Sequence, residues 1–176
     1  EAQASFEIPR EQKAGGRVEA VYPSAAVLPE NQLKFYLHFS TPMSRGEVYQ
    51  RVKLLEANGE PVELPFLELD QELWDGAGKR LTLLFDPGRV KRELKPHREA
   101  GTPLREGRSY TLVIDREWPD AEGRPLAQEY RKPFRVGAAD REPPNPRKWV
   151  IRAPQASTRE PVEVELGEPL DRALLE

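Results

Sequence analysis

Residues 32–43 constrain this chain more than any other stretch of its sequence. Leu33, Phe35, Leu37 and Phe39 alternate there with polar or amphipathic residues. Because successive side chains of an extended strand point to opposite faces, the alternation predicts a strand with one apolar face. This strand favours a β-sheet protein.

Other short alternating runs follow the same rule and are separated by turn signals. They lie at residues 17–22, 52–56, 62–69, 80–85, 108–115 and 129–136. Asn58-Gly59 predicts a hairpin between the second and third of these runs, because both positions tolerate the positive φ of a tight turn. The 18 prolines among 176 residues also favour an all-β domain with many corners. About seven strands result, which fits an antiparallel Ig-like sandwich and equally a small barrel.

The corner after this first strand carries a helix signal. Ser44-Arg45-Gly46-Glu47 follows Met43 and fits a capping box, so we expect one short helical turn at residues 45–50. The period of two also predicts which side chains form the core. We expect the inward face of the strand to pack against the later strands, with these members: Phe35, Leu37, Phe39, Leu83, Phe85, Leu112 and Ile114.

Composition excludes several classes of protein. The 27 basic and 30 acidic residues give a net charge of −3, which argues against nucleic-acid binding through phosphate contacts. The absence of cysteine excludes disulfides, thiolate metal sites and a cysteine nucleophile. No apolar run approaches the ~20 residues that span a bilayer, so we expect membrane attachment only through regions outside this chain. A first residue of Glu1 without an apolar signal segment suggests a chain processed or cut from a longer precursor.

The sequence divides into four segments. Residues 1–16 are a polar leader or linker, residues 17–137 the sandwich, and residues 138–148 a linker whose Pro143, Pro144 and Pro146 make it semi-rigid. Residues 149–176 then repeat the first strand and its corner 127 positions later. The matched residues are Val162, Val164, Leu166, Pro169 and Leu170 with Phe35, Leu37, Phe39, Pro42 and Met43. We therefore expect residues 149–176 to be the first part of a second, incomplete Ig-like repeat.

Three motifs resemble bacterial Ig-like domains of the S-layer-protein type. They are Phe39-Ser40-Thr41-Pro42-Met43, the run from Leu104 to Leu112, and the turn from Asp120 to Leu126. They occur in that family's order across residues 17–136. The departures are a long loop at residues 89–107 and Arg124, where asparagine is usual.

This resemblance implies a non-catalytic structural or interaction module of a larger exported protein. Such modules serve as spacers, stalks or adhesion units in the periplasm, at the cell surface or in secreted proteins. The implied partners are neighbouring domains of the same polypeptide and a protein or glycan of the cell envelope. No catalytic residues exist in the family to carry over.

Two kinds of binding site deserve weighing against plainer explanations. Asp115, Asp120 and Glu122 could supply oxygen ligands to calcium, although turns favour Asp and Gly for backbone reasons alone. Trp74 and Trp118, with Tyr36 and His38, are candidate ligand contacts, because exposed rings stack on sugars. A tryptophan in a β-domain more often belongs to the core, and a lone strand histidine more often contacts a neighbouring strand. His97 lies in a charged loop and is expected to be solvated.

An enzyme is the remaining alternative. The carboxylates at Glu63, Glu68, Asp70, Glu72 and Asp75 could include the pair that a glycosidase needs. A solvated acidic face explains them more simply. The sequence contains no Gly-x-Ser-x-Gly, Walker or Gly-x-Gly-x-x-Gly motif. We therefore expect a module without catalysis or a cofactor, and keep a carbohydrate-binding sandwich and a hydrolase as alternatives.

Overall fold

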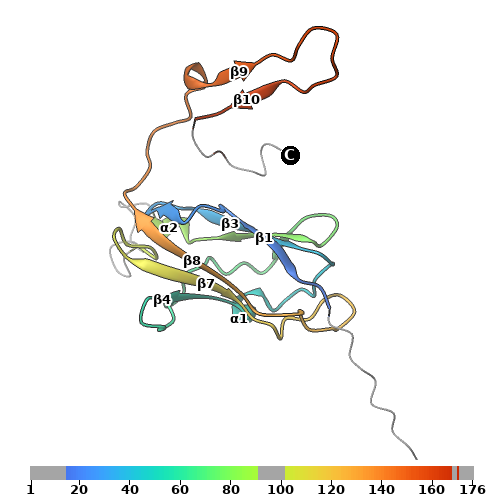
Figure 1. The fold of residues 1–176 in the computed structure, drawn as a ribbon. Helices are drawn as coiled ribbons and strands as arrows, with labels where there is room; N and C mark the ends of the chain where they lie inside the picture. The colour runs from blue at the N-terminus through green and yellow to red at the C-terminus, as the bar shows by residue number, and fades with distance from the viewer. Residues whose placement is uncertain (1–14, 91–101, 168–169, 171–176) are drawn as a thin grey trace, which may run out of the picture.

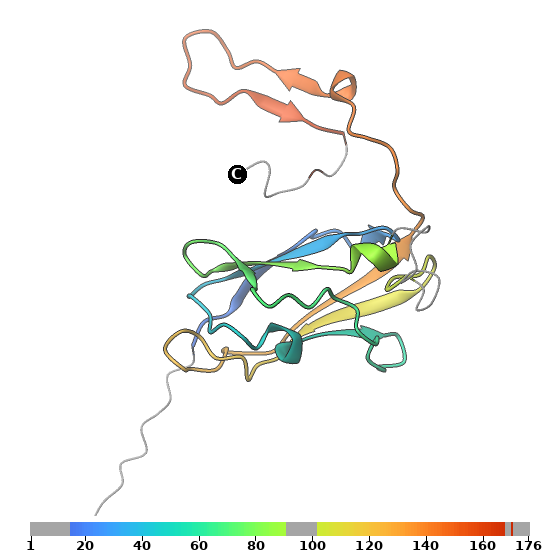
Figure 2. The same cartoon turned by 180° about the vertical axis from the view of Figure 1, so that it is seen from behind.

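Two four-stranded sheets pack face to face in the computed structural model (Figures 1 and 2), which describes residues 15–90, 102–167 and 170. One sheet has the order β1-β3-β6-β5 and the other β2-β8-β7-β4. The all-β sandwich predicted from the sequence is confirmed. Its strands are β1 (Val18–Tyr22), β2 (Val27–Pro29), β3 (Lys34–Phe39), β4 (Val52–Glu56), β5 (Leu73–Trp74), β6 (Arg80–Leu84), β7 (Ser109–Ile114) and β8 (Tyr130–Gly137).

The strand order is that of an immunoglobulin-type sandwich and not of a barrel. The A-B-E-D sheet corresponds to β1-β3-β6-β5, and C, F and G correspond to β4, β7 and β8. The pairs are antiparallel except that β2 runs parallel to β8, with Leu28 opposite Val136. The sequence interpretation treated residues 24–31 as a plain connection. There the chain leaves the first sheet after β1 and covers the edge of β8 in the second.

The core lies between the sheets and is centred on β3. Phe35 and Leu37 are completely buried, and Phe39 retains 2% of its surface. The ring of Phe35 lies 5.6 Å from that of Phe85 and 5.8 Å from that of Phe134, so it joins both sheets. All the predicted core partners are buried, namely Leu83, Phe85, Leu112 and Ile114.

A β-bulge changes the phase of β1. The alternation in the sequence groups Val18, Ala20 and Tyr22 on one face. The register shifts between Val18 and Ala20, so that Val21 faces the core opposite Leu37. Tyr22 consequently lies on the outer face of the sheet. A bulge inserts one residue into a strand, which inverts the facing of every residue beyond it.

The expected return strand at residues 62–69 is wrong. In place of a continuous ladder, the chain here makes isolated bridges, from Pro61, just before this segment, to Leu55 and from Phe66 to Phe85. Pro61 and Pro65 lack the N–H that a continuous ladder needs. Leu64 adopts a φ of 41°, which an extended strand does not contain. The strand that instead completes the first sheet is the two-residue β5.

Two short helices, α1 (Val48–Arg51) and α2 (Pro87–Val90), lie in connections between strands of different sheets. The predicted capping box is wrong, because Glu47 is the N-cap residue of α1 and no side chain of the box caps it. Within the described residues, no helix has the length and apolar character needed to cross a membrane. His97 falls outside the described residues.

The segment after β8 leads to a separate β-hairpin. It passes through the 3-10 turn η1 (Pro146–Lys148) into β9 (Val150–Arg152), which pairs antiparallel with β10 (Glu163–Glu165). Figures 1 and 2 show this hairpin standing off from the sandwich at the end of an extended linker.

Candidate functional site

Two of the predicted contact residues lie on the outer face of the β1-β3-β6-β5 sheet. The alternation of β3 turns Tyr36 and His38 outward, because Phe35, Leu37 and Phe39 face the core. Tyr22 of β1 is opposite Tyr36, and its ring lies edge-on to His38 at 5.3 Å. The phase change in β1 therefore builds an aromatic cluster outside the sheet.

Cations cover this cluster. Lys34 Nζ lies 5.1 Å from the centroid of the Tyr36 ring, and the Arg80 guanidinium carbon lies 5.9 Å from it. Both distances are typical of cation–π contacts. Tyr36 keeps only 8% of its surface exposed, so its ring offers no open platform on which a sugar could stack.

A groove of about 440 Å³ borders the aromatic cluster at the edge of the sheet. It forms where the chain crosses from β1 to β2, and it combines apolar walls with a few polar groups. A groove of this size falls within the range of small-ligand pockets. Its lining residues on the sandwich and linker include Tyr22, Pro23, Ala25, Leu28, Lys34, Tyr36 and Asp140.

A buried lysine lies beneath the same crossing. Lys132 of β8 is 8% exposed, and its Nζ donates to the backbone oxygens of Ser24 at 3.0 Å and Ala25 at 3.1 Å. Burial lowers its pKa, because removal from water disfavours the charged form. The sequence interpretation missed Lys132. The signal was its position in phase with the core residues Phe134 and Val136.

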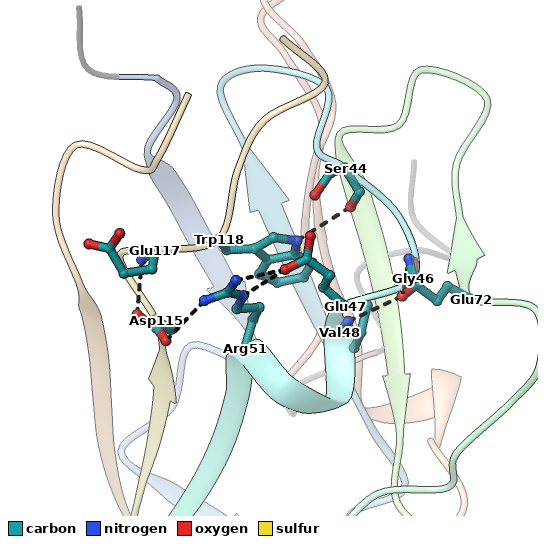
Figure 3. Close-up of polar contacts among 9 residues, drawn as sticks. All are labelled: Ser44, Gly46, Glu47, Val48, Arg51, Glu72, Asp115, Glu117 and Trp118. Carbon is teal, nitrogen blue, oxygen red and sulfur yellow. Dashed lines mark hydrogen bonds and ion pairs between the residues drawn. The ribbon is translucent and has the colours of Figure 1, made fainter. Parts of the chain in front are cut away.

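The two candidate tryptophans, Trp74 and Trp118, lie on the opposite side of the sheet from Tyr36 and His38. Trp118 is completely buried, with its ring 5.3 Å from Phe39 and 5.9 Å from Trp74. Its Nε1 donates to the backbone oxygen of Ser44 at 3.3 Å (Figure 3). Trp74 is half-buried, and its Nε1 donates to Glu72 at 2.7 Å. The four candidate contacts therefore do not form one site, and Trp118 has no face that a ligand could reach.

A network of ion pairs and hydrogen bonds holds the end of the sandwich near α1 (Figure 3). Arg51 Nη2 lies 2.8 Å from Glu47 Oε2, and its Nη1 lies 3.6 Å from Asp115 Oδ2. Glu72 Oε1 accepts from the backbone N–H of Gly46 at 2.8 Å and of Val48 at 3.2 Å. Glu72 thus supplies the helix cap that we expected from Ser44.

The three carboxylates considered for calcium are held by arginines. Asp120 Oδ2 lies 2.8 Å from Arg124 Nη2, and Glu122 Oε2 lies 3.0 Å from Arg124 Nη1. Asp115 faces Arg51 instead. Across residues 15–90, 102–167 and 170, no group of three or more His, Cys, Asp or Glu side chains is placed to hold a metal ion. The geometry therefore gives calcium binding no support.

Members of the acidic cluster have separate structural roles or face solvent. Glu63, Glu68 and Asp70 are exposed. Asp75 Oδ1 accepts from the backbone N–H of Lys79 at 2.8 Å and of Arg80 at 3.1 Å, which closes the turn before β6. Burial opposes ionisation of Asp75, but these hydrogen bonds outweigh it and lower its pKa.

The strand order and the core between the sheets are those of an immunoglobulin-type β-sandwich. No protein-family model matches this chain, and no curated protein matches its sequence. Among solved structures, domains 1–6 of the surface layer protein SbsC match 69% of this chain at 14% identity and a TM-score of 0.43. Native alpha-2-macroglobulin of Escherichia coli, spanning domains MG0-NIE-MG1, matches 71% of it at 14% identity and a TM-score of 0.41. The chain spans 14% and 33% of those two chains. At this similarity the fold rests on the strand order of the chain itself.

Proposed function

We propose that this protein is a non-catalytic structural module of a larger exported polypeptide, in which Ig-like units follow one another and contact their neighbours. The observation that carries the proposal is a repeated strand pairing. In the sandwich, Val21 of β1 is opposite Leu37 of β3. In the hairpin, Ile151 of β9 is opposite Val164 of β10.

The second residue of each pair occupies an equivalent position of the repeat. Val164 follows Leu37 by the same 127 positions that relate the two copies of the strand in the sequence. Ile151 follows Val21 by 130 positions instead, so the correspondence rests on β10 and on the antiparallel pairing that it shares with β3. This equivalence supports our proposal that residues 149–176 open a second unit of the same kind.

The two pairs differ in exposure: the pair in the sandwich is buried, and the pair in the hairpin is open to solvent. Val21 and Leu37 are 3% and 0% exposed, whereas Ile151 and Val164 are 69% and 45% exposed. An isolated two-stranded hairpin is at best marginally stable in water. We propose that neighbouring strands of the same polypeptide cover this apolar face, so that the main partner of the module is its own chain.

The proposed export and the proposed lack of catalysis have separate support. The three motifs shared with bacterial Ig-like domains support a location in the periplasm, at the cell surface or in the medium. The candidate carboxylates Glu72 and Asp75 hold backbone N–H groups, which supports a structural role for them. A hydrolase would need such groups to face a substrate.

Cell fractionation tests this proposal. An antibody against the chain should detect it in the envelope or secreted fraction, as part of a polypeptide heavier than 20.1 kDa. Protease treatment of intact cells should distinguish surface from internal protein. A band of cytosolic protein with the mass of this chain alone would contradict both export and tandem organisation.

Carbohydrate binding is the competing function that the aromatic residues suggest. The coverage of Tyr36 by Lys34 and Arg80 and the burial of Trp118 speak against a stacking platform. A glycan array with the complete chain decides between the two functions. Binding that is lost in Tyr22→Ala but kept in Leu64→Ala would favour the carbohydrate function.

A further inference from the structure

The side chain of Asn31 holds the first residues of the linker that follows β8. Its Oδ1 accepts from the backbone N–H of Asp140 at 2.9 Å, and its Nδ2 donates to the backbone oxygen of Asp140. The backbone N–H of Glu30 donates to the oxygen of Gly137 at 3.1 Å. An amide that pairs with both backbone groups of one residue sets the orientation of that residue as well as its position. The root of the linker is therefore fixed to the turn between β2 and β3.

The parallel pairing of β2 with β8 brings these partners together. Pro29, the last residue of β2, is opposite Gly137, the last residue of β8. The turn after β2 and the linker after β8 therefore start side by side. Holding Asp140 then closes only the short stretch from Gly137, which costs little chain entropy. Asn31 thus extends the contact between the two segments beyond the end of the sheet.

The middle of the linker has a composition that restricts its backbone. Residues 138–148 contain neither glycine nor serine, the residues of flexible linkers, and three of the four residues at 143–146 are proline. Asp140 Oδ1 accepts from the backbone N–H of Glu142 at 3.1 Å, just before the prolines. Figures 1 and 2 show this stretch as an extended chain, as expected of a proline-rich spacer.

A capped turn forms the far end of the linker. Asn145 Oδ1 accepts from the backbone N–H of Arg147 at 3.1 Å, and the backbone oxygen of Asn145 accepts from that of Lys148 at 2.9 Å. The N–H of Trp149 donates to the oxygen of Pro146 at 3.2 Å, so that η1 leads directly into β9. The linker is therefore restrained at its root, along its middle and at its end.

We infer that residues 137–148 form a stiff strut, locked at its root by Asn31, which sets the direction in which the chain leaves the sandwich. A strut of this kind gives the following unit a fixed orientation, whereas a free linker lets it rotate. The inference goes beyond the proposed structural role, because it depends neither on export nor on the kind of unit that follows the linker.

Spin labels measure the strut directly, because the chain contains no cysteine and introduced cysteines are the only labelling sites. The pair Glu117→Cys and Lys148→Cys places one label in the exposed connection from β7 to β8 and the other at the exposed end of η1. Pulsed dipolar spectroscopy on the complete chain should give a narrow distance distribution. Dilution with unlabelled protein should leave it unchanged, because both labels lie in one molecule.

Asn31→Ala should broaden the distribution at least twofold, because it removes both bonds to Asp140 and leaves the linker sequence intact. Asn58→Ala is the matched control. Asn58 also accepts from a backbone N–H, that of Glu60 at 3.0 Å, but it lies in the turn after β4. Circular dichroism and unfolding curves verify that each variant retains the sandwich. A broad distribution in the parent, or equal widths in Asn31→Ala and Asn58→Ala, would overturn the lock at the root.

A second variant tests the middle of the strut separately. Pro143→Gly combined with Pro144→Gly leaves Asn31 and Asp140 in place and should also broaden the distribution, because glycine restores the backbone freedom that proline removes. An unchanged width in this variant would show that the prolines do not stiffen the linker, and would overturn the strut.

Discussion

Asp120 and Arg124 close the turn between β7 and β8 through both oxygens of one carboxylate. Asp120 Oδ1 accepts from the backbone N–H of Arg124 at 3.0 Å, and Oδ2 accepts from its Nε at 3.0 Å. The backbone N–H of Glu122 also donates to Oδ1, at 2.9 Å. The arginine that departs from the motif of the resembling family therefore has a structural role in this chain.

Asp120→Asn should destabilise the sandwich by about 1.5–3 kcal/mol at pH 7, the range for hydrogen bonds to a charged group. Burial opposes ionisation of Asp120, but its hydrogen bonds with Arg124 and Glu122 outweigh this effect and lower its pKa below 3.8. Its stabilising contribution is therefore present above about pH 4 and is lost as the pH falls through the lowered pKa. Urea unfolding from pH 7 to pH 3 should show the difference between parent and variant shrinking. Glu122→Gln, a change at an exposed carboxylate, should have little effect.

Glu72→Ala should cost about 0.5–2 kcal/mol, as the loss of a helix N-cap does. The side chain accepts from the N–H of Gly46 and Val48 at the start of α1 and from Trp74 Nε1. Chemical denaturation measures the cost, and tryptophan fluorescence reports the change around Trp74. Glu68→Ala is the control, because Glu68 is exposed. Equal stabilities of the two variants would contradict the capping role.

Phe39→Ala should cost about 3–5 kcal/mol, the range for truncating a buried phenylalanine. The ring lies 5.9 Å from Trp74 and 5.3 Å from Trp118, and no neighbouring group can fill its space without moving. Guanidinium unfolding followed by tryptophan fluorescence tests this value. Leu33→Ala, at a half-exposed position before β3, should cost far less. A loss below 1 kcal/mol in Phe39→Ala would show that the assigned core face is wrong.

The difference in unfolding free energy between Lys132→Met and the parent should favour the variant more at neutral pH than at high pH. Burial lowers the pKa of Lys132 from its usual 10.5, so the folded state releases this proton before the unfolded state does. The cost of burying the charge is therefore present at neutral pH and is relieved as the pH rises through the lowered pKa. Unfolding at pH 7, 9 and 10 measures the trend. Lys53→Met, at an exposed lysine, should show no such trend.

The regular alternation of β3 made the core predictable. An extended strand has only two faces, so Phe35, Leu37 and Phe39 had to share one of them. The same rule failed in β1, because the bulge near Ala20 depends on how β1 pairs with β3. Pairing is a property of two strands, and one strand's sequence does not contain it.

The candidate site was less predictable than the core. Tyr36 and His38 could be assigned to the outer face from alternation alone, but the cations above Tyr36 come from another strand as well as from its own. The sequence around Lys132 is that of an ordinary surface lysine, because its partners, the backbone oxygens of Ser24 and Ala25, lie far away in the chain. Such sites depend on contacts between distant segments, which local patterns do not report.

The parallel pairing of β2 with β8 has a mechanical consequence. The N–H of Gly15 donates to Pro125 near the start of β8, whereas the linker leaves at Gly137, the last residue of β8. The chain thus enters and leaves at opposite ends of the sandwich (Figure 1). A pulling force on these two points would load the bonds between Val27–Pro29 and β8 in shear, so that they break together and not one after another. Such a geometry resists extension along the line that joins the two points.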